Sequence, residues 1–252
     1  MKKFKFTGET VTLQDGTVLH RIECMVEIAR KVRVGDLGGF IEKEENLSGN
    51  AWVYGNARVS GNARVYGNAE VSGNAEVSGN AEVSGNARVS GNAEVSGNAR
   101  VYGNAWVYGN ARVYGNAWVY GNAEVYGNAW VYGDAEVAGN ARVSGNAWVY
   151  GNAWVYGDAE VSGNARVYGN AEVYGNAWVS GNADYIVFKN WWSSGRWFTW
   201  TRSNNKWRVG CFYGTGKELI KKAYSDSEES GKQYERIVKY VELVIQDENE
   251  DN

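Results

Sequence analysis

The sequence predicts an all-β solenoid, in which short parallel strands coil around one axis, between a small β cap and a small α+β domain. A six-residue unit, Gly-Asn-Ala-x-Val-Tyr/Ser, recurs without insertion from Gly49 to Gly181. The chain has 33 glycines and no proline, which indicates turns at regular intervals and not a collagen or a disordered linker. The flanking segments lack the repeat, so we assign residues 49–183 to the solenoid.

Each unit reads as one short strand followed by a corner. Ala and Val alternate with x, which is Trp, Arg or Glu throughout the repeat. This alternation predicts that Ala and Val point inward and that x points outward, together with the Tyr or Ser that follows. In one unit Ala138 takes the place of Tyr or Ser. Gly-Asn tolerates left-handed backbone and makes the corner. No unit can bury its own apolar face, so stability must come from coils stacked ~4.8 Å apart.

The spacing of Val53 and Ala57, an aliphatic residue with a small residue four positions later, resembles the hexapeptide-repeat family of left-handed parallel β-helices. The resemblance implies a triangular coil of three units, or about 18 residues, and it alone implies the left-handed sense. With that period, Arg64, Glu82 and Arg100 become vertical neighbours, and such pairs would fix the register of the coils. Duplication of the repeat would produce the same alternation by chance.

Residues 1–48 are predicted to cap the first coil, whose open strand edges would otherwise invite aggregation. Asp15 and Gly16 form a hairpin turn, and Leu47 falls in phase with the repeat valines. Short strands are expected at residues 4–6, 11–13 and 18–22.

Residues 184–245 are predicted to form a separate α+β domain, followed by a disordered acidic tail at 246–252. Antiparallel strands are expected at 185–188, 197–201 and 207–212, and helices at 217–224 and 232–244. This combination, and above all the entry segment 35–48, is similar to uncharacterised proteins encoded by bacteriophages and prophages. That resemblance implies an origin, and with it the cytoplasm of a bacterial host, but no activity.

Catalysis is not expected. Members of the hexapeptide-repeat family include acyltransferases with a catalytic histidine and a carbonic anhydrase with three metal-binding histidines. This chain has one histidine, His20, which lies in the predicted cap, so we expect no metal, no cofactor and no acyltransferase chemistry. The two cysteines, Cys24 and Cys211, read as small buried residues without a disulfide. The repeat has no threonine, which argues against ice binding.

Two further features of the sequence argue against a phosphate-binding loop and against a membrane protein. The segment 210–218 has the wrong spacing for a phosphate-binding loop, and Thr215 with Glu218 reads instead as a helix capping box. No apolar run approaches the ~20 residues of a membrane span, and no apolar stretch follows the basic N-terminus. We therefore expect a soluble cytoplasmic protein that has no contact with a membrane.

A basic aromatic block at residues 189–222 is the first candidate binding surface. It carries eight Lys or Arg residues against one Glu. Aromatic stacking combined with positive charge is typical of sites for nucleotides and single-stranded nucleic acid. The alternative is that the aromatic residues form the core of a small sheet. The candidate ligand-binding residues are Trp197, Trp200, Arg202, Lys206, Arg208 and Lys217.

The second candidate surface is an aromatic region on one side of the coil. Exposed aromatic patches usually mark an interface, and hexapeptide-repeat relatives are commonly trimers. We therefore expect self-association as a trimer or dimer, with capture of a host protein as the alternative. The candidate interface residues are Tyr114, Trp130, Tyr132, Trp148, Tyr150 and Tyr168.

Together these features predict a non-catalytic binding protein of phage or prophage type, whose coil is a rigid scaffold presenting the C-terminal domain. In its sharper form the hypothesis is an anti-defence protein that captures a host immune protein or its nucleotide signal. The alternatives are a structural or assembly protein of a phage particle and the disfavoured acyltransferase-like enzyme.

Overall fold

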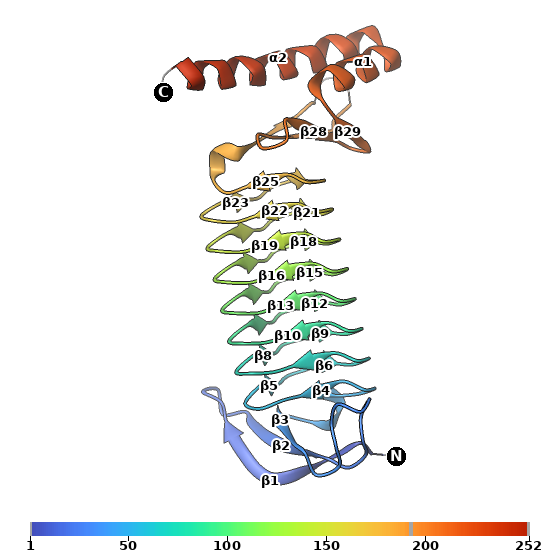
Figure 1. Cartoon of the computed structure of the whole chain (residues 1–252), viewed down its shortest axis with the longest axis vertical. Helices are drawn as coiled ribbons and strands as arrows, with labels where there is room; N and C mark the ends of the chain where they lie inside the picture. The colour runs from blue at the N-terminus through green and yellow to red at the C-terminus, as the bar shows by residue number, and fades with distance from the viewer. Residues whose placement is uncertain (1, 192–193, 251–252) are drawn as a thin grey trace.

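The computed structural model describes residues 2–191 and 194–250, and the side chains of residues 2–191 and 194–247. The chain forms a β-solenoid of about eight turns, about 18 residues apart. An N-terminal strand region lies at one end of the coil, and a small antiparallel sheet with two helices lies at the other (Figure 1). The predicted fold class is confirmed; the left-handed sense stays a prediction.

Three parallel sheets form the faces of the solenoid, and each unit contributes one two-residue strand. The first face comprises β4 (Trp52–Val53), β7 (Glu70–Val71), β10 (Arg88–Val89), β13 (Trp106–Val107), β16 (Glu124–Val125), β19 (Arg142–Val143), β22 (Glu160–Val161) and β25 (Trp178–Val179). The second comprises β5 (Arg58–Val59), β8 (Glu76–Val77), β11 (Glu94–Val95), β14 (Arg112–Val113), β17 (Trp130–Val131), β20 (Trp148–Val149) and β23 (Arg166–Val167). The third comprises β6 (Arg64–Val65), β9 (Glu82–Val83), β12 (Arg100–Val101), β15 (Trp118–Val119), β18 (Glu136–Val137), β21 (Trp154–Val155) and β24 (Glu172–Val173).

Alanine and valine form the core of the coil, as the alternation predicts, but Trp52 of the first coil, expected to point outward, is also buried, next to the N-terminal cap. Ala105 and Val107, in the middle of the array, have no exposed surface. The coil ends slightly earlier than expected, because Ala183 is exposed and belongs to a short 3₁₀ helix, η2 (Asn182–Asp184). Tyr185 stands where the repeat would place the next valine, and the Asp184 carboxylate accepts from the N–H groups of Ser180 and Gly181, so the repeat ends here.

Each corner needs glycine for two reasons. Gly103 has φ +74°, a left-handed conformation that other residues rarely adopt. A Cβ atom at Gly103 would also lie 3.0 Å from the backbone nitrogen of Gly121 in the next coil. The glycine columns therefore allow the corners of successive coils to approach closely.

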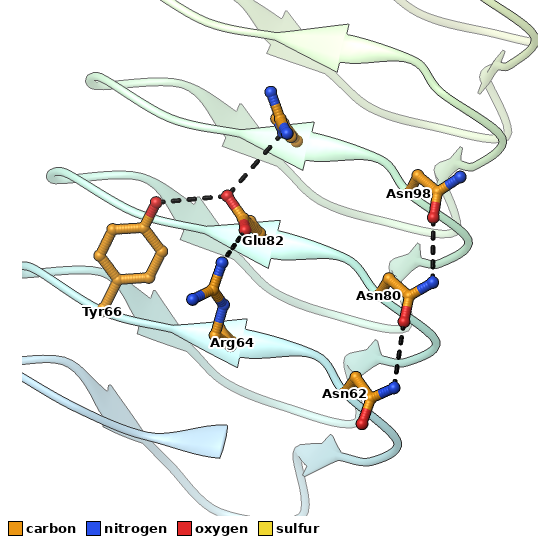
Figure 2. A network of polar contacts seen from close by, with 7 residues as sticks. Asn62, Arg64, Tyr66, Asn80, Glu82 and Asn98 are labelled. Carbon is orange, nitrogen blue, oxygen red and sulfur yellow. Dashed lines mark hydrogen bonds and ion pairs between the residues drawn. The ribbon is translucent and has the colours of Figure 1, made fainter. Parts of the chain in front are cut away.

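Polar side chains also stack from coil to coil (Figure 2). The Nδ2 of Asn62 donates to Oδ1 of Asn80 at 3.2 Å, and such asparagine ladders recur along the corners. On the third face Arg64 donates to Glu82, and Arg100 lies 3.8 Å from the same carboxylate. The predicted charge columns are thus present, whereas the asparagine ladders were not anticipated.

The N-terminal cap continues the second face of the solenoid. β1 (Phe4–Thr12) pairs antiparallel with β2 (Val18–Cys24), which pairs with β3 (Leu37–Ile41). β3 then pairs parallel with β5, and a short 3₁₀ helix, η1 (Glu44–Asn46), follows it. β1 is one strand with an irregularity after Phe6, where two strands were expected. Leu47 forms a parallel bridge with Val65, which confirms its phase.

The C-terminal domain is a four-stranded antiparallel meander covered by two helices. Its strands are β26 (Tyr185–Lys189), β27 (Trp197–Thr201), β28 (Lys206–Val209) and β29 (Phe212–Gly214). The helices are α1 (Gly216–Asp226) and α2 (Glu228–Glu250). No helix in the described part of the chain has the length and apolarity needed to cross a membrane.

The C-terminal domain differs from expectation at two places. A turn at Gly210, with φ +56°, divides the expected single strand 207–212 into β28 and β29. α2 runs to Glu250, through most of the segment expected to be a disordered tail, because that segment contains no glycine or proline to break the helix. Residues 251–252 of that tail, and Ser193 of an expected turn, lie outside the described residues. The Thr215–Glu218 capping box is confirmed.

The two ends of the coil expose opposite backbone groups. The N–H of each outward residue points toward the C-terminal end, as in the bond from Trp52 N to Ala69 O. The last coil therefore offers donors, and side-chain oxygens of the C-terminal region accept them. Arg166 N donates to Asn182 Oδ1 at 2.9 Å, Glu172 N to Thr199 Oγ1 at 2.9 Å, and Trp178 N to Ser203 Oγ at 2.7 Å.

The first coil offers carbonyl groups, and the N-terminal cap supplies the donors. Phe40 N donates to Ala57 O at 2.9 Å through the pairing of β3 with β5. The fully buried Asn46 donates from Nδ2 to Ala63 O at 2.8 Å. The caps thus complement the two ends chemically, since buried backbone groups must find partners.

Candidate functional site

A column of stacked tyrosines runs up the second face of the coil. Tyr114 and Tyr132 have ring centroids 4.9 Å apart and are nearly parallel. Tyr132 and Tyr150 repeat this geometry at 4.9 Å, and Tyr150 and Tyr168 at 5.3 Å. The structure therefore brings the four tyrosines of the predicted aromatic region into one column.

A second column stands beside the first. Trp130 and Trp148 stack at 5.1 Å, Arg112 lies 5.3 Å from the Trp130 ring, and Arg166 lies 4.8 Å from the Trp148 ring. Two tryptophans are thus sandwiched between two guanidinium groups, a favourable cation–π arrangement. The predicted candidate interface residues consequently form one continuous surface, which we call the aromatic face.

The stacking decides what the aromatic face can offer a partner. Rings that stack along the axis of the coil cover one another's faces, so their edges point outward. A ligand that needs a ring face can reach one only at the end of the column. Tyr168 is the last tyrosine, and 52% of its surface is exposed.

Of the three corners of the last coil, one is covered by the end of the coil itself, one by the C-terminal domain, and the third is open. A Cβ at Gly163 would lie 2.6 Å from the carbonyl oxygen of Ser180, and the hydroxyl of Tyr213 lies directly over Gly175. At Gly169, next to Tyr168, a Cβ would meet nothing within 4 Å. The open corner therefore follows from how the C-terminal domain sits on the coil.

A cleft of about 610 Å³ lies above this open corner, and we call it the junction cleft. In the coil below, Tyr150 N donates to Val167 O at 2.9 Å and Asn152 N to Gly169 O at 2.8 Å. The equivalent N–H group of Asn170 has no hydrogen-bond acceptor among the described residues, whereas that of Tyr168 faces the hydroxyl of Tyr185. The residues that line the junction cleft include Tyr150, Arg166, Tyr168, Asn170, Tyr185 and Trp197.

The charge of the junction cleft comes from Arg166. Tyr185 donates from its hydroxyl to Arg166 O at 2.7 Å, and burial raises the pKa of Tyr185 above its ordinary value. Burial likewise raises the pKa of Tyr132 on the aromatic face. Both phenols stay protonated near neutral pH. The cleft favours anionic or acceptor-bearing ligands because, among the described residues, its lining includes the cation Arg166 and no carboxylate.

The predicted ligand-binding residues of the basic aromatic block do not converge. Trp200 is 2% exposed, packs in the core under the helices and donates from Nε1 to Asn205 Oδ1 at 2.9 Å. It has no face left for a ligand, because strand alternation points it toward α1 and α2. Arg208, on the opposite side of the sheet, lies 2.9 Å from Glu172 and 5.0 Å from the Tyr174 ring, and so joins the domain to the coil.

The remaining cations of the block lie near separate carboxylates. Lys206 contributes to a lowered pKa of Glu218, whose main cause is the hydrogen bond from the Thr215 backbone. Arg202 lies close to Asp184. The exposed Lys217 lies in the first turn of α1. Trp197 is 36% exposed and reaches the junction cleft, whereas Trp192 of the same block lies outside the described residues.

The residues weighed for catalysis lie in structural positions. The His20 ring packs 4.9 Å from the Phe6 ring in the N-terminal cap. Cys24 is buried, which raises the pKa of its thiol, but Cys211 is exposed and not buried as expected, because it lies in the turn between β28 and β29. Among the described residues no group of three or more His, Cys, Asp or Glu side chains could hold a metal ion.

Comparison with known proteins identifies the repeat. The YdcK beta solenoid repeat model matches residues 51–67, 57–73, 93–109, 105–121, 117–133, 135–151 and 141–157, all within the coil. A search of curated proteins found no match. The chain is therefore a parallel β-solenoid repeat protein, and the comparisons leave its ligand to be inferred from the junction between coil and C-terminal domain.

Proposed function

We propose that this β-solenoid repeat protein is a non-catalytic binding protein whose coil is a rigid scaffold for the C-terminal domain, and that its ligand occupies the junction cleft. The open corner at Gly169 carries the proposal. There the last coil keeps the free backbone donor of Asn170 and an exposed tyrosine face beside Arg166. The lining of the cleft as a whole comes from the coil and from the C-terminal domain, so the cleft depends on the whole junction.

Several contacts support a fixed orientation of the C-terminal domain. Thr199 and Ser203 accept hydrogen bonds from two different faces of the last coil. The ion pair of Arg208 with Glu172 is largely shielded from solvent on both sides. A cleft held in this way is preorganised, and a preorganised site loses less entropy when it binds.

The chemistry of the junction cleft favours a ligand that combines a planar ring with an anionic group. A ring can stack on the exposed face of Tyr168, as bases do on aromatic side chains. Phosphate or carboxylate oxygens can accept from the N–H group of Asn170 and pair with Arg166. A nucleotide has both parts.

This chemistry supports the sharper form of the hypothesis. The protein would then be a phage- or prophage-type protein that acts in the bacterial cytoplasm and captures a nucleotide signal of host defence. Capture of a host immune protein and a role in the particle are the alternatives. Detection of the protein in purified particles would favour the structural role.

Calorimetry with adenosine 5′-monophosphate and short oligonucleotides at low salt tests the proposal. We expect binding that weakens as salt is added, because phosphate contacts release counterions. Tyr168→Ala and Arg166→Glu should each weaken it at least about tenfold, the size of one charge-assisted contact. Arg142→Glu, the same change of charge on the first face, should leave binding unchanged.

Absence of binding to the wild-type chain at low salt would exclude nucleotides as ligands. Equal binding by the wild-type chain and the Tyr168→Ala chain would place the ligand elsewhere. Circular dichroism of each variant shows whether the coil is intact, since a solenoid that unfolds would lose its β signal.

A further inference from the structure

A second tyrosine column, on the third face of the coil, lacks an aromatic ring at Ser84 and at Ala138. Ala138 stands where the other units carry tyrosine or serine. The column consists, in order, of Tyr66, Ser84, Tyr102, Tyr120, Ala138, Tyr156 and Tyr174.

The gap has the dimensions of one aromatic ring. Tyr102 and Tyr120, which occupy adjacent rungs, stack at 4.9 Å with parallel planes. Tyr120 and Tyr156 are two coils apart, or ~10 Å at the usual strand spacing, and Ala138, at the rung between them, has no ring. A cavity of about 270 Å³ occupies this place, and we call it the ring slot. Its lining residues are Tyr120, Glu136, Ala138, Gly139, Trp154, Tyr156 and Gly157.

Two ring faces bound the ring slot. The far face of Tyr120 is covered by Tyr102, and the far side of Tyr156 is contacted by Tyr174 at 4.3 Å and by Arg208 at 5.5 Å. The faces turned toward Ala138 are those that a tyrosine at this position would cover. A planar ring in the slot would therefore stack on both sides with the geometry of the column itself.

The ring slot also has a hydrogen-bond donor whose equivalent is satisfied in two other coils. Where a tryptophan stands above a serine, its indole donates to the hydroxyl, as Trp106 does to Ser90 and Trp178 to Ser162, both at 3.1 Å. Trp154 stands above Ala138, which has no acceptor, and its Nε1 makes no hydrogen bond among the described residues. Trp154 is also 44% exposed, so a ligand can reach it.

An acceptor lies in the same slot. Glu136 accepts from the Tyr120 hydroxyl at 3.0 Å and is the charged residue of the lining. Its carboxylate has further lone pairs for an N–H group of a ligand. Because no cation lines the slot, an anionic ring would be repelled.

We propose that the ring slot binds a planar bicyclic nitrogen heterocycle that has both an N–H donor and a ring-nitrogen acceptor and that is neutral or cationic. The ring replaces the missing rung between Tyr120 and Tyr156. Its N–H donates to Glu136 and its ring nitrogen accepts from Trp154. This site is on the third face and is independent of the junction cleft on the second.

Calorimetric titration of the full chain with benzimidazole tests the proposal. Benzimidazole has both a donor and an acceptor, indole has the donor alone, and benzimidazole-5-carboxylate is anionic. We expect benzimidazole to bind more tightly than indole by about tenfold, the value of one hydrogen bond, and the carboxylate to bind weakest.

Matched variants locate the site. Ala138→Tyr restores the rung and should abolish binding, whereas Ser84→Tyr fills the corresponding gap between Tyr66 and Tyr102 and should leave it unchanged. Ala138→Ser gives Trp154 the acceptor that Trp106 and Trp178 have, so it should reduce benzimidazole binding toward that of indole. This small change keeps the test valid even if the tyrosine variant folds poorly.

Arg166→Glu, which alters the junction cleft alone, should not affect benzimidazole, so failure of the proposed function and failure of this inference are distinguishable. Undetectable binding of benzimidazole to the wild-type chain would overturn the proposal. Equal binding by the wild-type and Ala138→Tyr chains would do the same.

Discussion

Glu172 and Thr199 join the coil to the C-terminal domain: the backbone N–H of Glu172 donates to Thr199 Oγ1 at 2.9 Å. In every lower coil of this face the equivalent N–H finds a carbonyl oxygen in the next coil, as Trp154 finds Ala171. At the last coil a side-chain hydroxyl replaces that carbonyl. Thr199 is 2% exposed, so water cannot substitute for it.

Thr199→Val is therefore expected to destabilise the junction, because the isosteric methyl group leaves the Glu172 N–H without an acceptor. Loss of one buried acceptor costs about 1–3 kcal/mol of unfolding free energy. Urea denaturation followed by circular dichroism measures it. Thr199→Ser keeps the hydroxyl and serves as the control. If the valine and serine variants were equally stable, the bond would contribute nothing to the cap.

Alanine substitutions at two glycine corners can distinguish the cost of left-handed backbone strain from the cost of steric contact with the next coil. Gly103 and Gly169 have nearly the same backbone, with φ of +74° and +68°. A Cβ at Gly103 would lie 3.0 Å from Gly121 N, whereas a Cβ at Gly169 would meet nothing within 4 Å. Gly169→Ala should cost only the left-handed strain, about 1–2 kcal/mol, and Gly103→Ala clearly more.

Thermal unfolding of both alanine variants checks this expectation. A lower melting temperature for Gly103→Ala than for Gly169→Ala would confirm that coil contact adds to the strain. Equal melting temperatures would mean that neighbouring coils yield to a methyl group at no cost.

The regular part of the molecule was predictable because one period fixes all of it. Once 18 residues make one coil, the column containing Arg64 and Glu82 follows by counting. In the sequence the ring slot is visible only as the substitution at Ala138. The structure is needed to show that Tyr120 lies one coil below this position and Tyr156 one coil above it.

The flanking regions were harder to predict, because their contacts are not periodic. Trp200 and Arg208 are both in an aromatic, basic stretch, yet Trp200 packs on the helices and Arg208 on the coil. Strand alternation predicts that Trp200 and Arg208 lie on opposite sides of the sheet. It does not predict which side packs on the helices and which on the coil. The open corner at Gly169 depends on where the whole domain rests, and no short motif records it.

Alkaline pH should destabilise the coil. Burial, followed by the hydrogen bond to Glu136, raises the pKa of Tyr120 from 10.0 to about 12, and burial together with Glu124 does the same for Tyr108. A folded-state pKa above the unfolded value means that protonated tyrosine is favoured in the folded state. The resulting stability is complete below pH 10 and is lost as the pH rises from 10 to about 12.

Denaturant titrations at several pH values between 9 and 12 would measure the loss. Tyr120→Phe removes the ionisable group and should flatten part of the pH dependence. Tyr240→Phe, at an exposed tyrosine of the C-terminal domain, is the matched control. A stability curve for Tyr120→Phe that falls as steeply as that of the wild-type chain would contradict the assignment.

Self-association is expected through the aromatic face. Its ring edges form a flat apolar strip on the second face, and the same face carries charged pairs such as Arg58 with Glu76 nearer the N-terminus. A symmetric dimer or trimer would bury Trp130 and Trp148 against another copy. At ~25 cal/mol per Å² such burial supplies several kcal/mol before association costs. Light scattering should show an oligomer for the wild-type chain and a monomer for Trp130→Ser/Trp148→Ser.

Trp106→Ser/Trp178→Ser, which removes two exposed tryptophans from the first face, is the control and should remain oligomeric. A wild-type monomer would leave the aromatic face free for another protein. An oligomer that survives the loss of both Trp130 and Trp148 would have to form through a different surface, because these two rings and the guanidinium groups stacked on them make up the tryptophan column of this face.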